Sequence, residues 1–315
     1  MRKLISIIIP AYNEEDCVDE LARRLQALFN LMSQYDFEVL LVENGSSDST
    51  WQRILQIRDQ DKRFKLIRLA RNFGMDGGLT AGLQLASGDA AVLMTADLQD
   101  PPELIEEFIR KWEEGYQNVY MVVAQRSGTG LLRRVNSLLF YSIVSKLSNI
   151  QIPRNASDFR LVDRQVYQTV LRMNERNRFM RGMFAWVGFR SIGIEAVRPI
   201  RYAGVSKAQS RVVFELATKG ILANSYIPLR SITVVGTAIS LLSILSILPL
   251  FIFWIVAGVP FAGFGSIISI ILLFFGILTL MIGIVAEYVA MIYEEVKARP
   301  NFVIETLLGF ESQPH

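Results

Sequence analysis

Carboxylates gather just after three apolar segments of the chain, where they could hold a cation. Glu14, Glu43 and Asp97 each lie in a stretch of small and polar residues that follows such a segment. Asp97 comes directly after the third segment, a position from which a carboxylate can reach a cation in a crevice. Acidic residues are also favourable at helix N-termini, where they accept hydrogen bonds from free N–H groups. The acids that fit equally well as helix caps are Asp48, Asp100 and Glu103.

A second group of charged side chains suits phosphate. Residues 126–230 carry 18 Lys and Arg against 5 Asp and Glu, a surplus of 13 positive charges. Arginine binds phosphate through its planar, bidentate guanidinium group. Many of these cations could instead face anionic lipid head groups. The candidates for phosphate contacts are Arg126, Arg133, Arg134, Arg160, Arg178, Arg181, Arg201 and Lys207.

Asp158 is the only acid between residue 126 and Asp163. Surrounding cations should lower the pKa of its carboxyl group and keep it ionised. Because groups with shifted pKa values cluster at active sites, we expect Asp158 near a reacting centre, where it would orient a phosphate group or assist proton transfer. The alternative is a structural ion pair with Arg154 or Arg160.

The elements that must position these residues follow from the apolar pattern. Runs rich in β-branched residues predict strands at 4–9, 37–42, 64–69, 90–95 and 119–124. Amphipathic segments between them predict helices at 14–32, 49–59, 75–86 and 101–114. This alternation indicates an α/β fold with a parallel sheet covered on both faces. Such sheets bind ligands beyond the carboxyl ends of their strands, where the three acidic stretches fall.

A block without charge indicates membrane insertion. Residues 231–286 contain no charged side chain, and roughly 20 apolar residues cross the hydrocarbon layer as a helix. The block therefore predicts two transmembrane helices, at 231–256 and 266–286. A buried helix pair in a soluble core is the alternative, but such helices do not need every face apolar. Basic residues before the first span and after the second place both chain ends in the cytoplasm.

Composition excludes several functional classes. With 51% hydrophobic residues the chain can form a core, so it is not a disordered protein. The single histidine is the last residue, His315, which argues against histidine-based acid–base chemistry and histidine-rich metal sites. The single cysteine, Cys17, excludes an internal disulfide.

The chain contains a series of short motifs in a fixed order. The N-terminal motifs are Pro10-Ala-Tyr-Asn-Glu14, Asn44-Gly-Ser-Ser-Asp48, Arg71-Asn-Phe-Gly74 and Ala96-Asp-Leu-Gln-Asp-Pro-Pro-Glu103. The later ones are Asp158-Phe-Arg-Leu161, Arg178-Phe-Met-Arg-Gly182 and Arg201-Tyr-Ala-Gly-Val-Ser-Lys207. Together these motifs resemble the family 2 glycosyltransferases, and most closely the polyisoprenyl-phosphate glycosyltransferases, the branch like dolichol-phosphate mannose synthase. The resemblance covers nearly the whole chain, and the two-helix membrane end resembles the bacterial undecaprenyl-phosphate glucosyltransferases.

The resemblance implies a GT-A (Rossmann-like) catalytic domain, a nucleotide-sugar donor, a divalent metal (Mg²⁺ or Mn²⁺) and a polyprenyl-phosphate acceptor. The residues that it places at the donor are Pro10, Ala11, Tyr12, Glu14, Glu43, Asp97, Leu98 and Gln99. The metal ligands among them are Asp97 and Gln99. The acceptor residues are Arg126, Arg133, Ser137, Arg201 and Lys207, and the catalytic residues are Asp97, Arg126 and Asp158.

Two positions depart from the family pattern. Asn44 and Thr95 each stand where the family usually has an aspartate. The lost carboxylates reduce the negative charge that faces a cation, so we expect metal binding without the donor to be weak. Asp97, the carbonyl of Gln99, waters and substrate phosphates could still complete the coordination of Mg²⁺.

The expected function is inverting transfer of a sugar, glucose from UDP-glucose by analogy, to undecaprenyl phosphate. The alternatives are a processive polysaccharide synthase and a non-catalytic homologue that recruits lipid or glycan. We expect a multi-pass protein of the cytoplasmic membrane that contacts membrane lipids, forms homo-oligomers and binds no nucleic acid. The expected parts are a donor and metal half at 1–125, a basic acceptor part with amphipathic helices at 126–230, the membrane helices at 231–286 and a cytoplasmic tail at 287–315.

Overall fold

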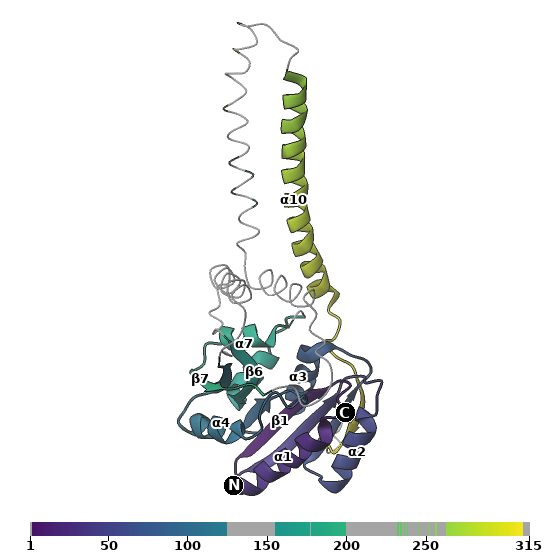
Figure 1. Ribbon diagram of the computed structural model, residues 1–315, viewed down its shortest axis with the longest axis vertical. Coiled ribbons are helices and arrows are strands. Elements are labelled where there is room, and N and C mark those ends of the chain that lie inside the picture. The colour runs from purple at the N-terminus through teal and green to yellow at the C-terminus, as the bar shows by residue number, and fades with distance from the viewer. Residues whose placement is uncertain are drawn as a thin grey trace.

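The computed structural model describes residues 2–124, 155–176, 178–199 and 263–310, and isolated positions between 232 and 256. These residues form an α/β body from which one long helix projects (Figure 1). The strands are β1 (Leu4–Ala11), β2 (Asp36–Glu43), β3 (Phe64–Leu69), β4 (Ala90–Leu93), β5 (Asn118–Val123), β6 (Ala156–Asp163), β7 (Ser191–Ala196) and β8 (Ile304–Leu308). The helices are α1 (Val18–Leu31), α2 (Thr50–Gln60), α3 (Gly74–Leu85), α4 (Leu104–Glu113), α6 (Arg164–Leu171), α7 (Met180–Trp186) and α10 (Phe264–Lys297).

The five strands and four helices predicted for the first 125 residues are confirmed, with ends shifted by a few residues. The strands lie in one sheet in the order β7-β5-β6-β4-β1-β2-β3-β8. Strands β4, β1, β2 and β3 run parallel, as predicted. Their carboxyl ends therefore meet at one edge and bring the acidic turns together.

The five predicted strands all run in the same direction, but the sheet as a whole is mixed. Strand β6 is antiparallel to both of its neighbours, β4 and β5, and β8 is antiparallel to β3. Both strands come from later in the chain, so the alternation of strands and helices in the first 125 residues could not reveal them. The insertion of β6 has a functional consequence, because it carries Asp158 into the sheet beside β4.

Apolar side chains fill two layers, one on each face of the sheet. Helices α1, α2 and α4 cover one face, and α3, α6 and α7 cover the other. Residues of β1 alternate between the layers: Ile7 and Ile9 pack under α1, and Ile8 packs under α3. Gly82 of α3 allows this contact, since a Cβ there would lie 2.3 Å from the Ile8 side chain.

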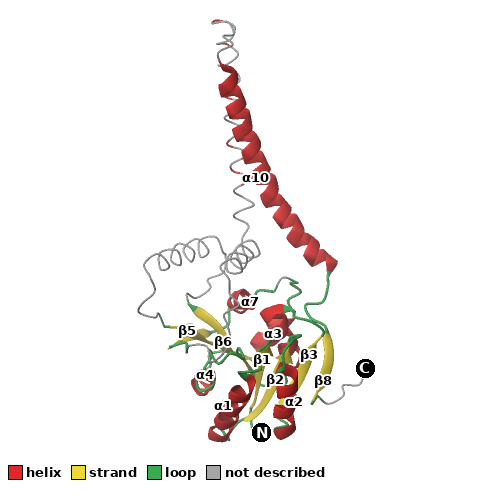
Figure 2. Ribbon diagram, turned by 45° about the vertical axis from the view of Figure 1, so that its right-hand side comes forward, coloured by secondary structure: helices red, strands yellow, loops and turns green. Residues whose placement is uncertain are grey.

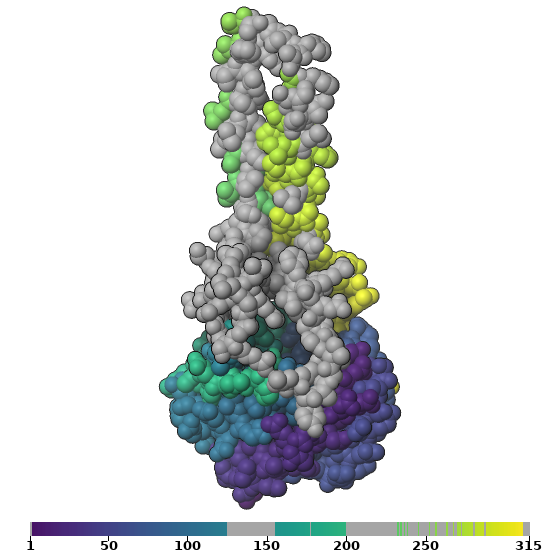
Figure 3. Space-filling model, in the orientation of Figure 1, coloured from purple at the N-terminus to yellow at the C-terminus, as the bar shows by residue number. Residues whose placement is uncertain are grey.

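Helix α10 is apolar enough to cross a membrane over Leu273–Lys297, and none of this stretch is buried within the protein. In the space-filling view the described part of α10 stands away from the α/β body (Figure 3). The helix continues past Ala286, where the sequence predicted the second span to end. The first predicted span, 231–256, and the amphipathic segments 133–150 and 212–227 lie largely or wholly outside the described residues.

The chain returns from α10 to the sheet. Residues Asn301–Phe310 run along the α/β body, and β8 pairs with β3 at the edge of the sheet (Figure 2). The side chains of Phe302, Ile304 and Phe310 pack against the apolar layer under α3. The segment after α10 therefore includes a structural strand of the sheet, which the sequence did not predict.

Candidate active site

The turns after β1 and β2 are joined by hydrogen bonds. The N–H of Asn13 donates to Ser46 Oγ (3.0 Å), and the N–H of Ser47 donates to Asn13 Oδ1 (2.9 Å). The N–H of Glu14 donates to Thr50 Oγ1 (2.9 Å) at the start of α2. The structure thus brings together the predicted donor residues of two strand ends, Pro10–Glu14 and Glu43.

Asn44 has a structural role that explains why it is not an aspartate. Its Nδ2 donates to the carbonyl of Gly74 (2.9 Å), and its Oδ1 accepts from the N–H of Phe73 (2.9 Å). A carboxylate could accept but not donate, and would face the Gly74 carbonyl. The next residue, Gly45, has φ +70° and packs so closely on Arg71 that a Cβ would lie 2.7 Å from its backbone. Asn44 therefore fixes the turn after β2 to the start of α3.

The turn after β4 joins two carboxylates through one hydroxyl. Thr95 Oγ1 lies 2.7 Å from Asp97 Oδ1 and 2.7 Å from Asp100 Oδ2. Asp100 is 1% exposed, and Arg198 Nη2 lies 3.4 Å from its other oxygen. Burial raises the pKa of Asp100, although Arg198 and Thr95 oppose this effect. Thr95 thus contacts two carboxylates that follow it in the chain.

Leu98 holds this turn in an unusual backbone conformation. Its φ is +57°, in the left-handed region that non-glycine residues rarely adopt. Its side chain is 2% exposed and belongs to the apolar layer under α1 and α4. Leu98, one of the residues predicted to bind the nucleotide-sugar, could therefore contact a ligand only through its backbone. The N–H of Gln99 donates to Asp97 Oδ1 (3.2 Å), which fixes the Asp97 carboxylate at the strand end.

The residues present suit a divalent metal that the substrate helps to hold. In the described part of the chain, no group of three or more acidic, histidine or cysteine side chains could bind a metal alone. Asp97 and Gln99 lie at the carboxyl end of β4, and Asp97 is 9% exposed. Mg²⁺ commonly uses one or two carboxylates, with waters and substrate phosphates as its other ligands. Asp97 and Gln99 fit that kind of site.

Asp158 of β6 is held by an arginine of α7, Arg181. Arg181 Nε lies 3.0 Å from Asp158 Oδ1, and Arg181 Nη2 lies 2.6 Å from Oδ2. Burial would raise the pKa of Asp158, but Arg181, Arg160 and Arg198 outweigh it and hold the pKa below its usual value. The sequence predicted that the pKa of Asp158 is lowered. It considered Arg154 and Arg160 as ion-pair partners, whereas the structure pairs Asp158 with Arg181.

Two other candidate arginines point into the protein. Arg160 is 3% exposed; it donates to the carbonyl of Ser157 (3.0 Å), and its guanidinium lies 4.9 Å from the centre of the Phe184 ring. Burial lowers its pKa to about 10, so it remains charged at neutral pH. Arg178 donates to the carbonyl of Met173 (2.7 Å), just after α6. Neither side chain is among the described residues that line the cavity beside Asp158.

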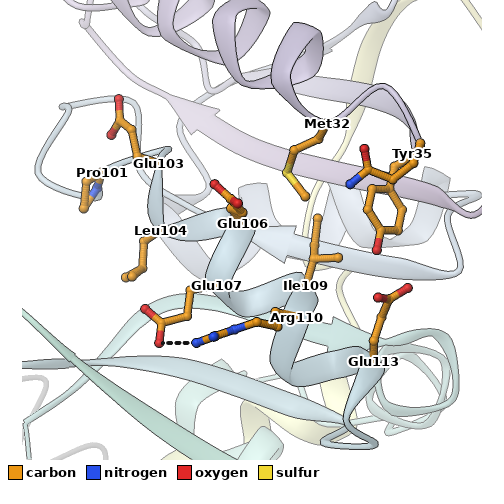
Figure 4. A pocket seen from close by; sticks show the side chains of 11 residues that line it. Met32, Tyr35, Pro101, Glu103, Leu104, Glu106, Glu107, Ile109, Arg110 and Glu113 are labelled. Atoms are coloured by element: carbon orange, nitrogen blue, oxygen red, sulfur yellow. Dashed lines mark hydrogen bonds and ion pairs between the residues drawn. The ribbon is translucent and has the colours of Figure 1, made fainter.

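Some of these groups line a cavity of about 240 Å³ just beyond the ends of β4 and β5, where β6 begins. Thr95 and Asp100 line one side, and Asp158 and Arg181 line the other, with Arg198 between them. The cavity is therefore the place where the turn after β4 meets the first described residues of the basic part. A larger depression of about 730 Å³ lies between the end of α1 and α4 (Figure 4). Its acidic residues, Glu103, Glu106, Glu107 and Glu113, would repel an anionic substrate.

Asp76 is a functional candidate that the sequence did not single out. It lies in the first turn of α3, and its carboxylate accepts a hydrogen bond from the N–H of Met180, next to Arg181. Burial and the nearby Asp158 raise its pKa to about 6. The only sequence signal was its place just after the Arg71-Asn-Phe-Gly74 motif.

The five predicted acceptor residues, Arg126, Arg133, Ser137, Arg201 and Lys207, lie outside the described residues.

Comparison with known proteins identifies the family. The model of Glycosyl transferase family 2 matches residues 6–171. This chain is a family 2 glycosyltransferase. The mixed α/β body agrees with the GT-A-like fold expected for such an enzyme. Asp97 and its turn lie within the matched residues, whereas Arg181 and Arg198 lie beyond them.

Full-length relatives support the narrower resemblance. The glycosyltransferase is 39% identical to an uncharacterized glycosyltransferase of Synechocystis, over 98% of this chain and 97% of that protein. It is 36% identical to the SfII prophage-derived bactoprenol glucosyl transferase of Shigella flexneri, over 96% and 97%. It is 34% identical to the prophage bactoprenol glucosyl transferase homolog of Escherichia coli, over 96% and 98%. The similarity extends through the membrane end of the chain.

Proposed function

We propose that this glycosyltransferase transfers glucose, with inversion, from UDP-glucose to undecaprenyl phosphate at the cytoplasmic face of the membrane. Relatives named bactoprenol glucosyl transferases match over nearly the whole chain, which supports the sugar and the lipid. The observation that carries the proposal is the cavity in which the Thr95–Asp97–Asp100 turn faces Asp158 and Arg181. Such a cavity can bring an anionic donor close to an anionic acceptor.

The proposed reaction needs little proton transfer. An oxygen of the lipid phosphate attacks C1 of glucose, the bond from C1 to the UDP oxygen breaks, and UDP leaves with the electron pair. A phosphate monoester has a second pKa near 6, so the attacking oxygen is already ionised at neutral pH. The protein must therefore mainly orient two anions and neutralise their charge.

Each described group has a role in this proposal. Asp97 and Gln99 would hold a divalent metal, which supplies Lewis-acid neutralisation of the leaving diphosphate. Asp158, kept ionised by Arg181, would orient the acceptor head group, and Arg198 would place positive charge beside the cavity. The predicted acceptor residues would bind the phosphate of the lipid; they are Arg126, Arg133, Ser137, Arg201 and Lys207.

The membrane arrangement belongs to the same proposal. Helix α10 would be one of two spans, with 231–256 as the other, and both chain ends would lie in the cytoplasm. The head group of a lipid acceptor stays at the membrane surface, so a catalytic body beside the cytoplasmic end of α10 could reach it (Figure 1). Oligomers would form through the small residues of the membrane helices.

One assay tests the proposal. Purified full-length enzyme is mixed with radiolabelled UDP-sugars and undecaprenyl phosphate, with Mg²⁺, with Mn²⁺ or with a chelator. We expect labelled lipid from UDP-glucose, a requirement for metal, and loss of product with Asp97→Asn. Release of UDP without lipid acceptor, or no labelled lipid with any UDP-sugar, would contradict the proposed transfer and favour the processive or the non-catalytic alternative.

A further inference from the structure

The end of the chain reaches the predicted donor site through one arginine. Arg68 of β3 lies beside Glu43 in the parallel pairing of β2 with β3. Its Nε is 3.3 Å from Glu43 Oε2 and also 3.3 Å from Glu305 Oε2 on β8. Its guanidinium lies 5.1 Å from the centre of the Trp51 ring on α2. Arg68 is therefore shared between a buried carboxylate of the site and a carboxylate of the returning strand.

An irregularity in the sheet makes this sharing possible. Arg68 pairs with Thr306 and Leu69 pairs with Ile304, so Glu305 is an extra residue on β8. In a regular antiparallel ladder Glu305 would lie opposite Leu69, and its side chain would point to the other face of the sheet from Arg68. A bulge turns a side chain toward the opposite face. Here it brings Glu305 to the face that carries Arg68 and Glu43.

Glu43 has one buried carboxylate oxygen that lacks a hydrogen-bond partner in the described structure. The residue is fully buried, and its Oε1 accepts a hydrogen bond from the N–H of Ser46. Its Oε2 has no hydrogen-bond partner in the described structure, although Arg68 Nε is close, because the two groups are not aligned for a hydrogen bond. A buried, unpaired carboxylate oxygen is costly unless a bound ligand supplies a donor.

We infer that Glu305 and Arg68 are positioning residues for the nucleotide base of the donor. Glu305 draws Arg68 toward β8, so that Arg68 neutralises Glu43 without occupying its Oε2. That oxygen then remains available to an N–H group of the base. The inference rests on the proposed function, because it assumes that Glu43 faces a nucleotide.

The consequence concerns donor affinity. Without the Glu305 charge, Arg68 can align with Glu43 Oε2 and compete with the base for it. Glu305 is half-exposed, so we expect UDP to bind about two- to fivefold more weakly to Glu305→Gln, the range of an exposed ion pair. The KM for the donor should rise by the same factor, and kcat at saturating donor should not change.

A double-mutant cycle tests the inference on the full-length enzyme. UDP affinity is measured by calorimetry for the unmodified chain, Glu305→Gln, Arg68→Gln and the double variant. If Glu305 acts through Arg68, Glu305→Gln weakens binding in the unmodified chain and has no effect in the Arg68→Gln background. The control is Asp59→Asn, which removes an exposed carboxylate that pairs with Lys62 and should leave UDP affinity unchanged.

The outcomes separate the two proposals. Unchanged affinity in Glu305→Gln overturns the inference, and so does an equal loss in both backgrounds, since β8 would then act through the stability of the sheet. Thermal unfolding of each variant checks that stability directly. Failure of the unmodified chain to bind UDP would overturn the proposed donor, and the inference with it. Normal UDP binding without transfer to the lipid would overturn only the proposed reaction.

Discussion

At the scale of single residues, the two departures from the family pattern are different in kind. Asn44 replaces a carboxylate with an amide that both donates and accepts, and so it joins β2 to α3. Thr95 replaces a carboxylate with a hydroxyl that contacts two other carboxylates. Neither change removes Asp97 from the end of β4. The departures therefore do not argue against catalysis.

We expect Asn44→Asp to destabilise the fold. The substitution removes the donor to the Gly74 carbonyl and leaves that group facing a carboxylate, at a cost of about 1–3 kcal/mol in the free energy of unfolding. Asn72→Asp is the matched control, because Asn72 Oδ1 accepts a hydrogen bond from the N–H of Gly74, which a carboxylate can also do. Denaturant unfolding measures both, and equal stability of the two variants would contradict the assignment.

We expect Arg181→Lys to lower turnover while leaving UDP affinity intact. Lysine cannot bind both oxygens of Asp158, so the carboxylate would lose its fixed orientation at the cavity. Misplacement of a positioned group can reduce the rate by up to about 100-fold. Steady-state kinetics with the lipid acceptor measure the effect, and the exposed Arg110→Lys serves as control. Full turnover of Arg181→Lys would show that the ion pair is only structural.

Asp76 should make stability depend on pH. Its pKa of about 6 in the folded protein is above the ordinary value of 3.8, so the folded state keeps the proton longer and loses stability as the pH rises from about 4 to 6. Asp76→Asn should therefore unfold with a higher free energy at pH 8, by at most about 3 kcal/mol, and show no gain below pH 4. Urea unfolding at both pH values measures the difference, and a gain that is independent of pH would refute this cause.

At the scale of elements, the strands are tied together at both ends. Turns join their carboxyl ends around the cavity, and Glu38 joins their amino ends. Glu38 is 3% exposed and accepts from Ser6 Oγ of β1 (2.5 Å), from Lys65 Nζ of β3 (2.6 Å) and from Ser87. This network holds the parallel strands in register on the side away from the cavity.

Glu38→Gln should lower the free energy of unfolding by roughly 3 kcal/mol at pH 7, because it leaves the partly buried Lys65 without its ion-pair partner. Burial would raise the pKa of Glu38, but Lys65, Ser6 and Ser87 together hold it below the usual value. Its contribution is therefore complete above the unfolded-state pKa and is lost as the pH falls through the folded-state value. Thermal unfolding from pH 7 to pH 3 should show the two proteins converging, and the exposed Glu106→Gln should match the unmodified chain throughout.

At the scale of the whole molecule, α10 brings the chain back to the α/β body, where it continues into β8. The N–H of Arg176, before α7, donates to the Glu295 carboxylate near the end of α10 (2.9 and 3.0 Å). Beyond α10, β8 closes the open edge of β3. The C-terminal end of α10 is therefore attached to the α/β body both by this hydrogen bond and by β8.

A chain ending at Arg299 should be markedly less stable than one ending at Phe310. The shorter chain loses β8 and the packing of Phe302, Ile304 and Phe310, and burying each apolar side chain completely is worth about 1.5–3 kcal/mol. It also exposes the edge of β3, which favours aggregation. Unfolding midpoints and size-exclusion profiles in detergent test this, and equal behaviour of the two chains would mean that β8 is not structural.

Local pattern was enough to predict the strands and helices of the first 125 residues and the long apolar segment of α10, because burial and periodicity act over a few neighbouring residues. It also located Asp97 and the basic surroundings of Asp158. The tertiary structure alone decided the antiparallel insertion of β6, the return of β8 and the partners of Asp158 and Arg68. These depend on pairing between distant segments, where a single extra residue such as Glu305 changes which face a side chain occupies.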